Sequence, residues 1–284
     1  VRNIISSILR RFIILIGIVS LFADITYQGA NSIKGPFLSI LGANATTVGI
    51  VAGFGELVGY CLRLVSGYIS DRTRKYWLIT FIGYTLNMIA VPAIALAGRW
   101  EIAAFLMITE RIGKAIRNPA RDAMLSHASK EIGRGRGFGL HEALDQIGAV
   151  LGPLSVAGVL YLNNSYRICF GMLLIPAIFA LGTLATARQL YPQPHNLEKV
   201  SPELETKGFP KKFWLYITAI ALVAAGYADF PLIAYHFKKV SIVSDTWIPL
   251  FYAITMGVDA LAALFFGYLY DRKGISILII TTLV

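Results

Sequence analysis

Long apolar blocks alternate with short polar segments along the chain. A helix needs about 20 mostly apolar residues to cross about 30 Å of hydrocarbon, and the blocks have that length. They run approximately over Arg11–Ile40, Thr46–Ser70, Tyr76–Ala97, Trp100–Leu125, Phe138–Leu162, Tyr166–Ala187, Phe213–Phe237 and Trp247–Tyr270. The pattern predicts an all-α membrane protein with these eight blocks as spanning helices, and the apolar tail from Gly274 as the start of a ninth.

One polar segment is much longer than the others. Residues 188–211 read RQLYPQPHNLEKVSPELETKGFPK, with several prolines and no apolar period, which is typical of an exposed linker. This linker divides the chain into an N-terminal bundle, residues 1–187, and a second part, residues 212–284. The second part holds two full predicted helices and part of a third.

The composition supports the membrane assignment. Hydrophobic residues make up 56% of the chain and charged residues 15%, whereas soluble domains average about 45–50% and about 25%. The net charge of +10 comes largely from loops on one side of the blocks, as in an orientation signal, and this argues against a nucleic-acid partner. We therefore expect a multi-pass protein of the cell membrane, in contact with the lipid bilayer, with a cytoplasmic N-terminus. Both cysteines fall inside apolar blocks, which excludes a disulfide framework.

Two short segments recur in the two parts of the chain. GYISDRTRK at residues 67–75 resembles GYLYDRKG at residues 267–274, so that Gly67 and Asp71 correspond to Gly267 and Asp271. FADITYQ and YADFPL align Asp24 with Asp229 at nearly the same offset. Two repeats at one spacing predict two related helix bundles, an architecture of transporters.

These motifs resemble those of the major facilitator superfamily of secondary transporters. The resemblance rests on a cytoplasmic turn signature and its second copy, on an Arg in the fourth helix and on small residues of the fifth. The matching positions are Gly67, Asp71, Arg72, Arg74 and Lys75; Gly267, Asp271 and Arg272; Arg111; and Gly148, Gly152 and Pro153. The match departs from the family pattern at Ala115, where a glycine is usual, and in the missing basic run of the second copy.

The resemblance implies two pseudo-symmetric six-helix bundles, the second incomplete here. The chain would then be a fragment covering about eight and a half of twelve helices. It further implies a turn at Gly67 that acts as a cytoplasmic latch, and a bend at Gly148, Gly152 and Pro153 of the kind found in antiporters. We also expect a monomer without cofactor or metal. For the turn, a pure orientation signal is the alternative, and for the bend, ordinary small-residue packing.

Span one carries a polar face at the depth of the bilayer centre. Asp24, Gln28 and Asn31 follow helical spacing, with Tyr27 beside them. A carboxylate inside the membrane is a functional candidate by default, so we expect proton coupling at Asp24, with Asp229, Glu56 and Asp259 as further buried candidates. The alternative is a structural Asp24 paired with Arg111. The expected substrate cavity comprises Tyr27, Gln28, Asn31, Arg111, Lys114 and Tyr227.

Span four holds Glu110, Lys114, Arg117 and Arg121 at helical spacing. Charges inside the bilayer face a cavity or opposite charges on another helix. We expect Arg111 and Lys114 to attract an anionic substrate or to tune a neighbouring acid. The more cytoplasmic charges are expected to form an ion network between spans four and five, comprising Arg117, Arg121, Asp122, Glu142 and Asp145. We also expect Asp71 to cap the helix that follows it.

The sequence therefore predicts secondary transport of a small molecule by alternating access, with proton-coupled efflux as the first hypothesis. Uptake of a sugar or organic anion by proton symport is the alternative within transport, and a non-transporting membrane sensor is another. HEALD, from His141 to Asp145, resembles a zinc-protease motif but lacks its second histidine. An enzyme is therefore not expected.

Overall fold

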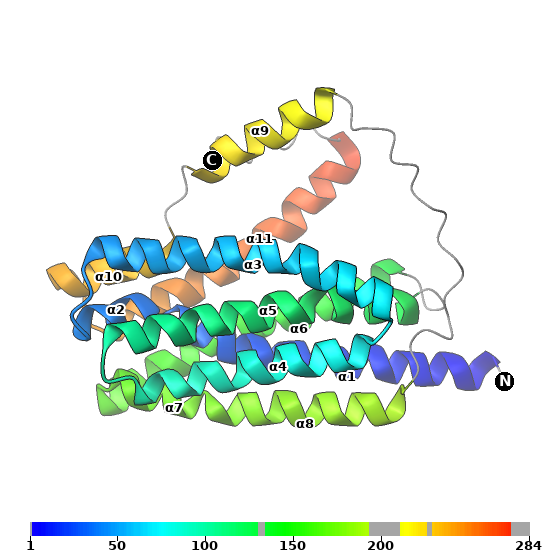
Figure 1. Cartoon of the computed structure of the whole chain (residues 1–284), viewed down its shortest axis with the longest axis horizontal. Coiled ribbons are helices and arrows are strands. Elements are labelled where there is room, and N and C mark those ends of the chain that lie inside the picture. Colours follow the sequence, from blue (N-terminus) through cyan, green and yellow to red (C-terminus); the bar gives the residue numbers. More distant parts are fainter. Residues whose placement is uncertain (1, 130–133, 193–210, 226–228, 274–284) are drawn as a thin grey trace.

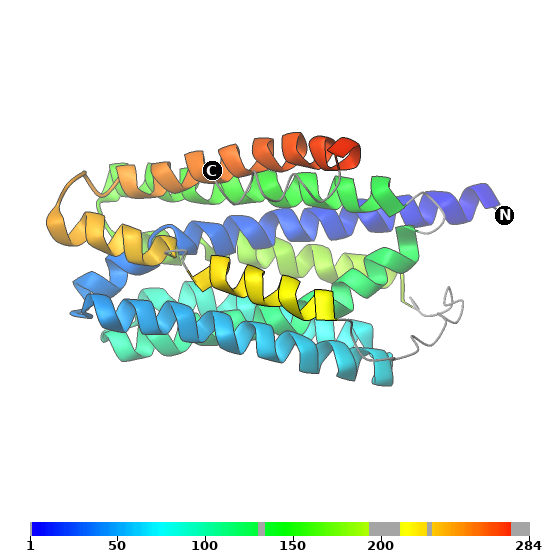
Figure 2. The ribbon, with the colours of Figure 1, turned by 90° about the horizontal axis from the view of Figure 1, so that it is seen from above.

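The computed structural model describes residues 2–129, 134–192, 211–225 and 229–273. All regular structure in these ranges is helical. The helices are α1 (Arg2–Asn31), α2 (Lys34–Ile40), α3 (Ala45–Thr73), α4 (Tyr76–Ala93), η1 (Ile94–Leu96), α5 (Trp100–Ser129), α6 (Arg134–Asn163), α7 (Tyr166–Met172), α8 (Leu174–Leu190), α9 (Lys211–Ala225), α10 (Phe230–Val240) and α11 (Trp247–Lys273). Helices α1 to α8 form one bundle along the long axis (Figures 1 and 2).

Four helical stretches are long and apolar enough to span a bilayer by length and composition among the described residues. These are Ala45–Thr73, Tyr76–Leu96, Phe138–Asn163 and Tyr166–Leu190. The predicted boundaries of α3, α4 and α6 agree with the structure to within a few residues. The start of α1 and the turn between α3 and α4 lie at the same end of the bundle (Figure 1), as the distribution of basic residues predicts.

Three of the predicted single spans comprise two successive helices in the structure, although the sixth still forms one stretch of spanning length. The first divides into α1 and α2 because Pro36 cannot donate to the carbonyl of Ser32 and its ring crowds that group. The sixth divides into α7 and α8 for the same reason, because Pro176 cannot donate to the carbonyl of Met172, the last residue of α7. The seventh divides into α9 and α10, and Pro231 lies in the first turn of α10, where no amide donor is needed. Pro231 therefore begins a helix rather than kinking one.

Two apolar clusters fill the bundle. One lies toward the N-terminal end of α1 and includes Phe12, Tyr84 and Met124. The other includes Phe37 of α2, Phe170 of α7 and Tyr235 of α10. Among the described residues, the second cluster alone includes side chains from the part after the linker, Tyr235 and the partly buried Leu232. The described C-terminal part therefore packs through α10 at the end that holds α2, and α11 packs against α6.

Glycines bring α1 and α6 into close contact. A Cβ on Gly152 would lie 2.5 Å from the carbonyl oxygen of Ile25 and 2.8 Å from the amide nitrogen of Gly29, and one on Gly148 would meet the carbonyl oxygen of Leu21. Real Cβ atoms do not come so close, so only glycine fits. Gly148 and Gly152, which were predicted to bend span five, thus pack against α1. Pro153, the third residue of that prediction, lies inside α6, and the helix continues on both sides of it.

Candidate functional site

A buried ion pair joins α2 to α5. The Lys34 ammonium is 2.5 Å from a Glu110 carboxylate oxygen, and the two side chains are 6% and 0% exposed. Lys34 also donates to Asn31 Oδ1 at 2.9 Å. Asn87 of α4 donates through Nδ2 to the Glu110 backbone carbonyl at 2.9 Å and to Oε1 at 3.3 Å. Buried charges need such partners to offset the cost of desolvation, and here each charge has at least two.

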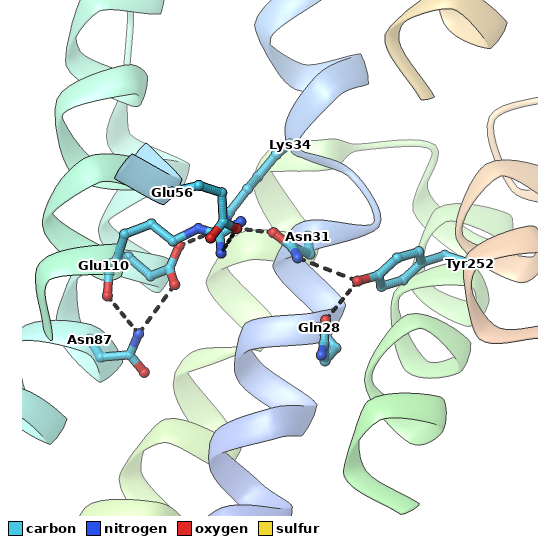
Figure 3. Close-up of polar contacts among 8 residues, drawn as sticks. Gln28, Asn31, Lys34, Glu56, Asn87, Glu110 and Tyr252 are labelled. Atoms are coloured by element: carbon cyan, nitrogen blue, oxygen red, sulfur yellow. Dashed lines mark hydrogen bonds and ion pairs between the residues drawn. The ribbon is translucent and has the colours of Figure 1, made fainter. Parts of the chain in front are cut away.

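Tyr252 connects this network to the C-terminal part (Figure 3). Asn31 Nδ2 donates to the Tyr252 hydroxyl at 3.3 Å, and that hydroxyl donates to Gln28 Oε1 at 2.7 Å. Tyr252 lies on α11 and packs against Phe230 of α10, with ring centroids 4.4 Å apart. Gln28 and Asn31, predicted as cavity residues, therefore contact the second part of the chain directly.

Tyr27 lies at the centre of a group of cations. The Lys114 ammonium is 3.5 Å from the centroid of its ring, the Lys34 ammonium 5.1 Å and the Arg111 guanidinium 5.4 Å. Cations within about 6 Å of an aromatic face are attracted by the ring quadrupole. The structure thus brings together Tyr27, Arg111 and Lys114, which the sequence analysis placed in one cavity.

Arg111 forms an ion pair with Glu56 of α3. The alternative in which Asp24 is a structural residue paired with Arg111 is therefore not found among the described residues, where Arg111 pairs with Glu56 of α3 and its guanidinium also lies near Tyr27 of α1. Glu56 and Arg111 line a cavity of about 150 Å³ together with Gly59, Tyr60, Arg63, Lys114 and Ala115.

Asp24 is buried, with 7% of its surface exposed, beside Gly148 of α6. The charged groups in its electrostatic range are Asp145, Lys114, Arg117 and Arg121. No ion pair to Asp24 occurs in the described part of the chain. One acid of α6 and three cations of α5 therefore set its charge environment from a distance.

The other acid candidates differ from Asp24. Asp229 is exposed and occupies the N-cap position of α10 without a capping bond. Asp259 is also exposed. The expectation that these two acids are buried is therefore wrong. Tyr227 lies outside the described residues.

The predicted ion network between α5 and α6 has a different form. Arg121 pairs with its neighbour Asp122 at 2.9 Å and donates to Ser20 Oγ at 3.2 Å. Ser20 in turn contacts His141 Nε2 at 2.7 Å. No ion pair joins α5 to α6 among the described residues, so that expectation is wrong, and the link runs through the Ser20 hydroxyl of α1.

The remaining members of that predicted network have other roles. Arg117 stacks on Tyr84, with its guanidinium carbon 4.2 Å from the ring centroid. Glu142 is exposed and accepts from Gln146 at 3.2 Å. Ligand atoms of His141, Glu142 and Asp145 lie within 4.8 Å of one another, but the Ser20 contact already engages one nitrogen of the His141 ring.

The turn motif lies at the end of α3. A Cβ on Gly67 would lie 3.6 Å from the Cβ of Pro119 in α5, an ordinary van der Waals distance, and Arg72 donates to the Tyr68 hydroxyl at 2.9 Å. Arg74 adopts the left-handed conformation, φ 54°, that usually favours glycine. Asp71 lies within the last turn of α3, while Lys75 is the N-cap of α4. The prediction that Asp71 caps α4 is therefore wrong, because α3 continues through Thr73.

The second copy occupies the equivalent place. Gly267, Asp271 and Arg272 belong to the last turns of α11, as Gly67 and Asp71 belong to those of α3. The repeat seen in the sequence thus corresponds to the same part of two long helices.

Sequence reasoning missed Lys34, Asn87 and Tyr252. Lys34 stands in SIKGPF at the end of an apolar block, where a lone lysine looks like a boundary residue. The available signal was its position ten residues after Asp24 in the same predicted span. Asn87 and Tyr252 carry no charge, and nothing in their surroundings distinguishes them.

Comparisons with known proteins agree with this architecture. The Major Facilitator Superfamily model matches residues 16–284. An uncharacterised protein of Mycobacterium tuberculosis is 43% identical over 271 residues, which is 93% of this chain and 66% of that protein. The multidrug resistance protein MdtH of Proteus mirabilis is 30% identical over 147 residues, 50% of this chain and 36% of MdtH.

A similar solved structure is that of the nucleoside transporter NupG. It superposes with a TM-score of 0.73 at 12% identity and covers 93% of this chain and 69% of NupG. At that identity the likeness shows the fold alone. Taken with the family match over almost all of the sequence, it means that the chain belongs to the Major Facilitator Superfamily, a family of membrane transporters rather than of enzymes.

Proposed function

We propose that the protein exports a small molecule in exchange for protons, by alternating access. The observation that supports this most directly is the buried polar network of Lys34, Glu110, Asn31 and Tyr252, which joins the two parts of the chain. Transporters of this architecture place substrate and coupling-ion sites at the interface between repeats. A network in that position responds to any rocking of one part against the other.

The end of the molecule that holds α2 is tightly closed. The Pro231 carbonyl of α10 occupies the space that a Cβ on Gly35 would need, and the Tyr235 hydroxyl donates to the Ala43 carbonyl at 3.2 Å. Lys238 pairs with Asp245 at 2.5 Å beside these contacts. With the N-terminus cytoplasmic, this closed end faces outward, and we infer that the central site opens toward the cytoplasm. An exporter loads its substrate in that state.

Asp24 is the group that we assign to proton binding. It is buried at mid-depth, has no ion-pair partner among the described residues and contacts the close α1–α6 packing. A change of its charge therefore acts on the interface between two helices. The name of MdtH, a multidrug resistance protein, supports export over uptake. We assign the protein to the cell membrane as a monomer.

Uptake by proton symport of a sugar or organic anion is the second candidate function. It is favoured by the excess of cations around Tyr27, which suits an anion entering from outside. Direction is therefore the property that the first experiment must resolve.

The test uses the full-length protein in inside-out vesicles with an imposed proton gradient and a pH-sensitive dye. Cationic drugs, sugars and organic anions are added in turn. Export by antiport predicts that one class releases protons from the vesicle lumen and that Asp24→Asn abolishes the release. Arg99→Gln, at an exposed ion pair with Glu101, serves as the control that keeps it.

Two results contradict the proposal. Proton movement in the opposite sense would establish symport. If none of the three compound classes moves protons although the protein keeps its unfolding temperature, a sensor or another coupling ion would be favoured. Asp24 would then be a structural residue.

A further inference from the structure

The cavity between α3 and α5 has more positive charge than its own acid can balance. Among its lining residues in the described part of the chain, Arg63, Arg111 and Lys114 are cationic and Glu56 is the single carboxylate. Glu56 pairs with Arg111. The Arg63 guanidinium lies 5.4 Å from the ring centroid of Tyr60, and Lys114 lies against the ring of Tyr27. Neither Arg63 nor Lys114 forms an ion pair within the part of the chain that the structure describes.

Other acids nearby do not remove this excess. Asp24 and Glu110 are in electrostatic range of Lys114, but neither is within ion-pair distance of it. Glu110 is already held by Lys34 at 2.5 Å and by Asn87. Asp229 acts on Arg111 from the start of α10 but is exposed. Arg63 is exposed, whereas Lys114 is partly buried. A partly buried cation without an ion-pair partner among the described residues is expected to take an anion, since an uncompensated charge inside a membrane protein is costly.

The size and the surroundings of the cavity restrict the kind of ligand that it can bind. Its volume is about 150 Å³, below the roughly 300 Å³ at which drug-sized ligand pockets begin. A second hollow shares Arg111, also includes Lys34 and is otherwise apolar, with Val51, Met107 and Pro231 among its lining residues. An anionic group on Arg111 and Lys114 would therefore have an apolar wall beside it.

We propose that this cavity binds the carboxylate of a small amphiphilic organic anion, with Arg111 and Lys114 as its ligands and Glu56 as the internal counter-ion that the substrate displaces. The inference rests on the proposed transport function, whose substrate class it names. The Arg111 guanidinium can donate two parallel hydrogen bonds to a carboxylate, but in this structure it is paired with Glu56. Substrate and Glu56 are therefore competitors for one guanidinium.

This competition distinguishes Glu56 from an ordinary binding residue. Removing the charge of a residue that binds the ligand lowers the affinity for the ligand, whereas removing the charge of a competing residue raises that affinity. Glu56→Gln keeps the size of the side chain and its ability to accept a hydrogen bond, but it no longer neutralises Arg111. Anion affinity should then rise, by about tenfold if the ion pair contributes about 1.4 kcal/mol to holding Arg111.

The experiment measures equilibrium binding to the purified full-length protein in detergent by isothermal titration calorimetry. The probes are benzoate, benzamide and the benzamidinium cation, which share a ring and differ chiefly in charge. Benzoate should bind at least about tenfold more tightly than either of the others. Arg111→Gln should lose at least about thirtyfold of the benzoate affinity, the lower range for removing one partner of a buried charge pair. Lys114→Gln should weaken it as well.

Two further variants complete the experiment. Glu56→Gln should bind benzoate more tightly than the parent, and Arg99→Gln, at the exposed position just before the helix of Arg111, should leave the affinity unchanged. Equal or tighter binding of benzamidinium would overturn the proposal. So would no binding of any probe, or weaker or unchanged benzoate binding in Glu56→Gln protein that retains the parent unfolding temperature. If that variant does not fold, the ratio of benzoate to benzamidinium affinity in the parent, together with Arg111→Gln, decides the question alone.

The binding result is independent of the transport result. The expected binding pattern without proton movement in vesicles would retain the anion site and reject antiport. Proton-coupled transport of a cation or sugar, with no preference for benzoate, would retain transport and reject the anion site.

Discussion

Loss of either charge of the Lys34–Glu110 pair should destabilise the protein strongly. Both side chains are almost fully buried, and removal of one partner leaves the other charge uncompensated. Such a change costs about 3–5 kcal/mol. At about 2–4 °C per kcal/mol for a domain of somewhat smaller size, Lys34→Met and Glu110→Gln should each lower the unfolding temperature by roughly 6–20 °C.

The double variant carries the more specific prediction. Lys34→Met with Glu110→Gln leaves no buried charge at the site, and the new glutamine side chain can still accept from Asn87. The two effects should therefore not add, and the coupling free energy should exceed about 2 kcal/mol. The double variant should unfold closer to the parent than either single variant does.

The assay is thermal unfolding of the full-length protein in detergent, followed by intrinsic tryptophan fluorescence. Arg99→Gln and Glu101→Gln form the matched control, because this pair is exposed, at 75% and 45% for the two side chains, and surface pairs contribute about 1 kcal/mol or less. Shifts for Lys34→Met and Glu110→Gln no larger than those of the control pair would contradict a strong contribution of the buried ion pair. A loss in the double variant equal to the sum of the two single losses would contradict the coupling between the two charges.

Three further outcomes follow from the packing and from the turn motif. Gly152→Ala should destabilise the protein by about 1–3 kcal/mol, because its Cβ would overlap α1. Gly158→Ala, on the same helix with open space around it, should not destabilise it; equal unfolding temperatures would contradict the close α1–α6 contact. Gly35→Ala should open the end that holds α2. A cysteine introduced at that end should then react more with a membrane-impermeant thiol reagent, and unchanged labelling would argue against closure by Pro231. Asp71→Asn should slow transport without reducing substrate binding, and a normal transport rate would reject the latch.

The class of the molecule and much of its layout could be predicted from local patterns in the sequence. Apolar blocks of membrane-spanning length are a local property, because each helix must satisfy its own backbone hydrogen bonds in lipid. The repeats at Gly67 and Gly267 likewise predicted two related helix ends, and the structure places both in the last turns of long helices. Residues that share a helix face, such as Gln28 and Asn31, were also predictable, since helical spacing fixes them.

Partners across helices could be identified only once the helices were packed together. Arg111 had several acids as possible partners in the sequence, and the packing of α3 against α5 selected Glu56 over Asp24. Lys34 forms the buried ion pair with Glu110 at the start of α2, directly after the break that ends α1. Tyr252 reaches Gln28 only because α11 packs against α6 beside α1. Such pairings depend on the relative rotation and offset of whole helices, which no local period encodes.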